Sequence, residues 1–121
     1  MIQAYIIAES MKPGSSLEGI SMTLTRISRA LSGNASADQP RAWTFIEFET
    51  MESPDRLADA LAAVLDDNPS RWYAHFVARD EMFVAFPKRV FRYQLGDATG
   101  RRKAQDYGRS IGIPASQLDW E

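Results

Sequence analysis

The one histidine of the chain, His75, is the side chain best suited to acid–base chemistry near neutral pH. Tyr73 lies two residues before it, so both side chains share one face if the segment is extended. A catalytic histidine also needs an orienting carboxylate and a nucleophile, and the sequence alone does not bring these together. We therefore predict no catalytic residue, and we take Tyr73, His75 and Arg92 as candidates to line a small-molecule pocket.

The segment Gly108-Arg109-Ser110-Ile111-Gly112 matches the Gly-x-Ser-x-Gly pattern of serine hydrolases. That pattern places the serine on a turn between a strand and a helix, with the histidine last in chain order. Here the serine falls at the predicted end of a helix, and His75 precedes it. Two glycines that close a helix explain the match better.

The absence of cysteine excludes a disulfide framework, a thiolate metal site and a cysteine nucleophile. With a single histidine, a zinc site would depend on carboxylates, which is an unusual ligand set for that metal. We expect no metal, no cofactor and no cofactor-binding residue.

Basic residues are dense between Phe86 and Arg109, with Phe91 and Tyr93 among them. Arginines and lysines that alternate with aromatic rings are typical of single-stranded nucleic-acid binding. The sequence pI of about 5.4 argues against it, and the same side chains would serve an acidic protein partner. Trp120, near the chain end, either packs against the domain or is offered to a partner. The candidate partner-binding residues are Lys88, Arg92, Arg101, Arg102, Lys103 and Trp120.

Six segments have the aromatic and β-branched content of strands, and turn residues bound most of them. The second is ambiguous, because its apolar residues fit a strand and also match a helical stripe at Leu17, Ile20, Leu24, Ile27 and Leu31. We favour a strand there. The expected strands are residues 3–10, a part of 17–31, 43–48, 72–79, 82–86 and 89–93.

Two helices have clear start signals. Ser53 is a good N-cap with Pro54 behind it, and Asn68-Pro69 stops that helix. Asp97 caps a second, polar helix that ends near Ser110. We predict an α+β fold, a largely antiparallel sheet of about five to six strands with two helices packed on one face. The element order is β-β-β-α-β-β-β-α, or β-α-β-α-β-β-β-α if residues 17–31 are helical.

The composition, 45% hydrophobic and 25% charged over 121 residues, is typical of one globular domain, which we expect to span residues 1–121. The first nine residues have no basic leader, and their apolar run is too short to cross a membrane. We expect a cytoplasmic protein with no membrane partner.

Two late segments, Val90-Phe91-Arg92-Tyr93 with Gly96-Asp97 and Gly112-Ile113-Pro114 with Gln117-Leu118-Asp119-Trp120, resemble a family of short uncharacterised bacterial proteins. The resemblance implies no activity, because the role of that family is unknown.

The sequence favours a non-enzymatic protein-interaction or regulatory module that acts on another protein or forms a homodimer through a sheet edge or an aromatic face. Two alternatives stay open. One is weak nucleic-acid binding through residues 88–109, and the other is a small-molecule-binding protein or enzyme with a pocket near His75.

Overall fold

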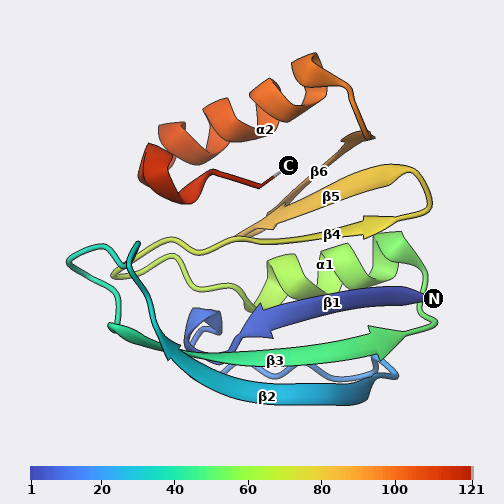
Figure 1. Ribbon diagram of the computed structural model, residues 1–121, viewed down its shortest axis with the longest axis horizontal. Coiled ribbons are helices and arrows are strands. Elements are labelled where there is room, and N and C mark those ends of the chain that lie inside the picture. The colour runs from blue at the N-terminus through green and yellow to red at the C-terminus, as the bar shows by residue number, and fades with distance from the viewer. Residues whose placement is uncertain (121) are drawn as a thin grey trace.

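The computed structural model describes residues 1–120 and contains six strands, two α-helices and two short 3-10 helices (Figure 1). The predicted α+β class and the element order β-β-β-α-β-β-β-α are confirmed, and residues 23–31 are a strand rather than a helix. No helix in the described part of the chain is long and apolar enough to cross a membrane. The elements are β1 (Ile2–Ile7), η1 (Ala8–Ser10), β2 (Thr23–Leu31), β3 (Ala42–Thr50), α1 (Pro54–Val64), β4 (Ala74–Ala78), β5 (Glu81–Phe86), β6 (Arg89–Gln94), α2 (Ala98–Ser110) and η2 (Ala115–Gln117).

The strands form two antiparallel sheets of three, in the orders β1-β3-β2 and β4-β5-β6, where a single sheet was expected. β1 and β4 lie side by side where the two sheets meet (Figure 1). Within residues 1–120 these two strands are not joined by a hydrogen-bond ladder. We call the line between β1 and β4 the seam.

The two helices cover opposite faces of the β4-β5-β6 sheet, which corrects the prediction that both pack on one face (Figure 1). β5 shows the reason, because its side chains are buried on both sides. Phe83 and Ala85 belong to the core beneath α1, whereas Met82, Val84 and Phe86 belong to the core beneath α2. A strand buried on both faces reads as a continuous apolar run, which hides the alternation expected of a one-sided sheet.

β2 is an edge strand, and most of its residues are exposed. A register shift between Leu24 and Arg26 inserts an extra residue relative to β3. Leu24 and Ile27 therefore pair with Phe48 and Ile46, which lie on the same face of β3. The bulge thus gives this strand apolar spacings that resemble those of a helix.

Both predicted helix caps form. The Ser53 Oγ accepts a hydrogen bond from the Arg56 N–H at 3.2 Å, with Pro54 as the first helical residue. The Asp97 carboxylate accepts from the N–H groups of Thr99 and Gly100, each at 3.1 Å. These bonds satisfy amide groups that have no partner within the helix.

Gly100 allows α2 to approach β6 closely. A Cβ at this position would lie 2.5 Å from the Cβ of Tyr93, an atom held by the strand backbone. We predict that Gly100→Ala lowers the free energy of unfolding by about 1 kcal/mol or more, because overpacking outweighs the better helix propensity of alanine. Urea unfolding measures the change. Lys103→Ala, on the exposed face of α2, is the control and should shift stability by less than about 0.5 kcal/mol. A stabilised Gly100→Ala variant would contradict the close approach.

Candidate functional site

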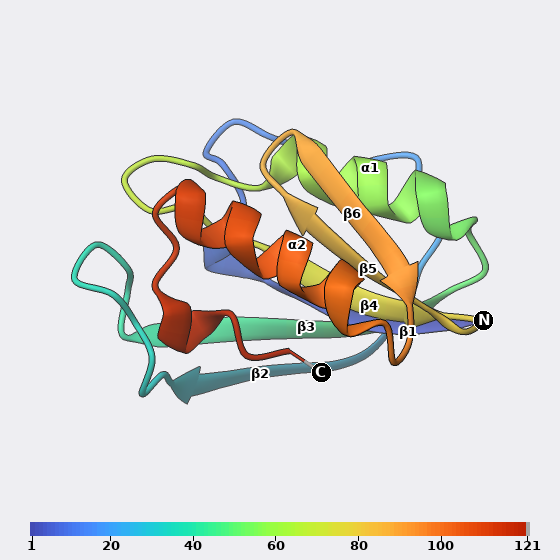
Figure 2. The same ribbon diagram turned by 90° about the horizontal axis from the view of Figure 1, so that it is seen from above.

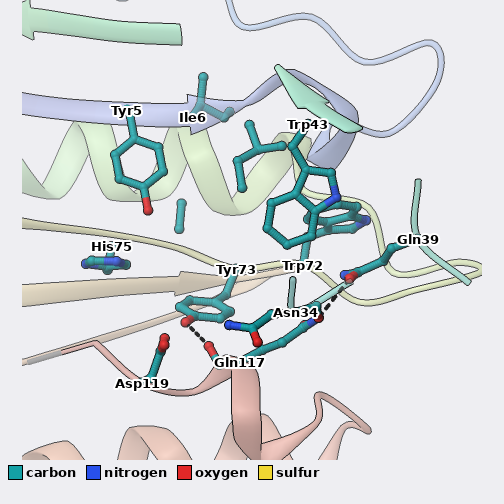
Figure 3. Close-up of a pocket in the computed structure, with 12 residues that line it drawn as sticks. Tyr5, Ile6, Asn34, Gln39, Trp43, Trp72, Tyr73, His75, Gln117 and Asp119 are labelled. Atoms are coloured by element: carbon teal, nitrogen blue, oxygen red, sulfur yellow. Dashed lines mark hydrogen bonds between the residues drawn. The ribbon is translucent and has the colours of Figure 1, made fainter. Parts of the chain in front are cut away.

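A pocket of about 130 Å³ opens at the seam, on the face of the sheets opposite α1 (Figure 3). Strands β1 and β4 form its walls, and the 32–41 loop between β2 and β3 and the C-terminal segment, residues 115–120, close its sides. Of the 12 residues that line this seam pocket, those with polar or aromatic side chains are Tyr5, Asn34, Gln39, Trp43, Trp72, Tyr73, His75, Gln117 and Asp119.

Tyr73, the residue before β4, and His75, within β4, both line the pocket, as their spacing implies. The intervening Ala74 and the following Phe76 belong to the core beneath α1. The rings of Tyr73 and His75 stack with their centroids 6.1 Å apart. Tyr5, from β1, meets His75 edge-on at 6.2 Å, so a row of rings spans the seam where a ladder is lacking.

The Tyr73 hydroxyl donates a hydrogen bond to the backbone carbonyl of Gln117 (Figure 3). Burial raises the pKa of this phenol, and the negative charge of Asp119 adds to the effect. Tyr73 therefore stays protonated at neutral pH and anchors the C-terminal segment to the chain just before β4.

His75 and Tyr5 both line the pocket. Burial lowers the pKa of His75 from its ordinary value of 6.5, although the Asp119 charge opposes this shift. The imidazole is therefore neutral at pH 7. Burial, with a smaller contribution from Asp119, also raises the pKa of Tyr5. Three ring side chains in the pocket thus feel the charge of one carboxylate.

The side of the pocket away from His75 is held by a glutamine bridge. The Gln117 Nε2 donates to the backbone carbonyl of Asn34 and to the Gln39 Oε1, the latter at 2.8 Å (Figure 3). Trp43 packs edge-on against Trp72 at 5.3 Å, and its indole N–H donates to the Pro40 carbonyl at 2.8 Å. The 32–41 loop is therefore tied to both β3 and the C-terminal segment.

The charge of the site is negative. Among the residues of the described chain that line it, Asp119 is the one with a full charge, and none is a lysine or arginine. The lining also contains no serine, threonine or cysteine that could serve as a nucleophile beside His75. Within residues 1–120, no three histidine, aspartate or glutamate side chains converge as metal ligands would.

Arg92 does not line this pocket, so its assignment beside Tyr73 and His75 is corrected. It lies on β6 opposite Phe83, on the face toward α1, and its guanidinium stacks 5.3 Å from the Phe83 ring. It makes ion pairs with Glu81 at 3.0 Å and with Asp55 at 2.9 Å. Residue alternation places His75 on the other face, because it pairs with Val84.

The basic residues between 88 and 109 are not gathered on one face. Arg89 stacks over Phe91 and Tyr107, at 4.8 and 4.9 Å, and Arg109 is paired with Asp106. Lys88 lies in the turn between β5 and β6. Arg101 and Arg102 border a shallow hollow at the start of α2, which the Asp97 carboxylate also borders, and Lys103 is exposed on α2.

Two other residues singled out in the sequence have structural roles. Trp120 is 3% exposed, its indole N–H donates to the Tyr93 hydroxyl at 2.7 Å, and its ring packs on Tyr73, so it is not a free partner-binding side chain. Ser110 is the last residue of α2 and donates to the Tyr107 carbonyl at 2.6 Å. The Gly-x-Ser-x-Gly match is therefore a helix end.

Sequence reasoning missed Tyr5, Trp43, Gln39, Gln117 and Asp119 as pocket residues. Each comes from an element distant in sequence from β4, and no local pattern joins them. One local pattern could have indicated the C-terminal segment. The polar Gln117 and Asp119 flank the apolar Leu118, which is the alternation of a segment with one buried and one polar side.

The burial of His75 makes the stability of the protein depend on pH. The unfolded chain titrates near 6.5 and the folded chain at a lower pH, so the unfolded state binds more protons between these values. We predict that the free energy of unfolding falls as the pH decreases from about 7 through the folded pKa of His75. His75→Gln should lack this loss. Urea unfolding of both proteins between pH 8 and 5 measures it, and a stability difference that does not change with pH would contradict it.

Comparisons with known proteins do not assign the chain to a family. It matches no protein-family model, no curated protein and no solved structure. The resemblance to short bacterial proteins stays a prediction. What the chain does must therefore be inferred from the geometry of its own site.

Proposed function

We propose that this protein is a non-enzymatic binding protein that holds one small organic molecule in the seam pocket. The observation that carries the proposal is the convergence of Tyr5, Tyr73, His75 and Asp119 on one concavity between two sheets. Pockets that are mostly apolar and aromatic, with a few converging polar groups, are typical ligand sites. Cavities of about 150 Å³ hold a benzene-sized molecule, so a ligand or ligand group of that size suits this pocket.

The polar atoms of the pocket support binding because several of them have no hydrogen-bond partner among residues 1–120. No hydrogen bond from the Tyr5 hydroxyl or from either His75 ring nitrogen forms within residues 1–120, and neither side chain is fully buried. Such atoms are free to bond to a ligand without breaking an internal contact. Tyr73 and Gln117, which are already bonded, would instead fix the shape of the site.

A matched set of three probes tests the proposal. Choline, 3,3-dimethyl-1-butanol and 3,3-dimethylbutanoate share one branched shape and differ in charge. We expect at least one of them to shift the imidazole proton signals of His75 saturably, since the chain has a single histidine. If no probe shifts these signals at millimolar concentration, the seam pocket is not a ligand site of this size.

The glutamine bridge provides a matched pair of variants. Gln117→Ala removes the contacts to Asn34 and Gln39, whereas Thr50→Val removes a hydrogen bond of 2.5 Å to the Ser21 carbonyl, between residues that do not line the pocket. We expect each variant to lose about 1 kcal/mol of stability. Gln117→Ala alone should weaken the bound probe. Equal affinities in both variants would show that the 32–41 loop does not take part in binding.

A second candidate function is recognition of an extended protein segment by the edge of β2. Leu24, Ile27 and Leu31 lie on one face of this strand and are 53%, 60% and 83% exposed. An unpaired strand edge is a template for adding another strand. β2 contains two arginines, Arg26 and Arg29, and no acidic residue. A partner segment that alternates acidic and apolar side chains would complement it, whereas a second copy would bring arginines together.

A synthetic peptide that alternates glutamate and valine tests this second candidate. We expect it to shift the β2 backbone amide signals, more weakly at high salt because the exposed charges are screened. Ile27→Lys should abolish the shift, and Val77→Lys, at an exposed apolar position on β4, should not. Absence of any shift would reject the candidate. A dimer in light scattering that Ile27→Lys dissociates would identify a second copy as the partner instead.

A further inference from the structure

We propose that the seam pocket selects a small organic cation, an alkylated ammonium group, over neutral and anionic molecules of the same shape. This inference rests on the proposed function, because it names the class of ligand for the same site. Its basis is that the residues among 1–120 that line the cavity combine one carboxylate with several aromatic rings and include no lysine or arginine.

The charges around the pocket favour a cation. Asp119 is exposed at its border, and its charge is felt by the side chains of Tyr5, Tyr73 and His75. The neutral state of His75 at pH 7 leaves this negative charge without a positive neighbour in the lining. Asp119 also makes no ion pair within residues 1–120. The Asp119 carboxylate would therefore repel an anion in the pocket and attract a cation.

The rings around the pocket add a second attraction. Tyr5 on β1, Trp43 on β3 and Tyr73 just before β4 surround the hollow in Figure 3, with Trp72 behind Trp43. The face of an aromatic ring carries partial negative charge and attracts cations that approach within about 6 Å of its centre. An alkylated ammonium suits such a site better than a metal ion, because its methyl groups bury apolar surface and need no hydrogen-bond acceptors.

The remaining polar atoms suit the rest of such a molecule. The Tyr5 hydroxyl points into the space between His75 and Tyr73 (Figure 3). A neutral imidazole has one donor and one acceptor nitrogen. A hydroxyl group attached to the ammonium, as in choline, could therefore hydrogen-bond to Tyr5 or His75 while the charged head lies against the rings.

The charge series separates this inference from the proposed function. We expect choline to bind at least about fivefold more tightly than 3,3-dimethyl-1-butanol, and 3,3-dimethylbutanoate to bind more weakly than either. Equal or tighter binding of the neutral alcohol, or of the anion, would overturn the selection of a cation but leave small-molecule binding intact. No shift of the His75 signals by any of the three would overturn both.

Variants of the pocket test the two attractions separately. Asp119→Asn should weaken choline about twofold to fivefold and leave the neutral alcohol unchanged. The control is Asp59→Asn, at an exposed position on α1 across the sheets, and it should change neither affinity. If the Asp119→Asn variant binds choline as tightly as the unmodified chain, the carboxylate does not contribute to cation binding and this part of the inference is wrong.

Substitutions at Tyr5 separate the contribution of the aromatic ring from that of the hydroxyl group. Tyr5 is 39% exposed, so the fold should tolerate its replacement. Tyr5→Leu removes the ring face and should weaken choline about threefold to thirtyfold. Tyr5→Phe keeps the ring and should retain most of the affinity. If both variants lose affinity equally, the hydroxyl rather than the ring recognises the ligand, and the aromatic part of the inference is wrong.

Discussion

The separation of β1 and β4 at the seam is the constraint on which the rest of the structure depends. The two strands are neighbours without a hydrogen-bond ladder, so side chains must join the two sheets. On one side α1 does so with a continuous apolar core that includes Ile6, Leu61 and Phe76. On the other side, stacked rings and the C-terminal segment bridge the gap and leave a hollow between them. The candidate site is thus a direct result of how two small sheets are joined.

The C-terminal segment is as important to the site as the strands. Figure 2 shows it turning back at the end of α2 and running beside that helix, and its residues Gln117 and Asp119 line the seam pocket. Three of its contacts hold it there. Tyr73 bonds to the Gln117 carbonyl, Gln105 bonds to the Leu118 carbonyl, and Trp120 is buried against Tyr93. One side of the pocket is therefore built from a segment that is held in place by contacts to α2, to β6 and to the residue before β4.

Most of the fold could be predicted from sequence because its signals are local. Strand composition, the Ser53 and Asp97 caps and the turn residues each act within a few positions, and the pairing of Tyr73 with His75 follows from alternation alone. The remaining features depend on contacts between distant segments. Seventy positions separate Tyr5 from His75. The β2 bulge, which gives Leu24 and Ile27 the spacing of a helix, and the position of Arg92 on the wrong face for the pocket both follow from pairing with another strand.

The position of β5 between two cores has a consequence for how the protein loses its structure. Phe83 is packed beneath one helix and Val84, the next residue, beneath the other. Neither core can come apart without exposing a strand that the other requires. Unfolding should therefore be cooperative, with α1 and α2 melting in one transition although they do not share a face of the sheet.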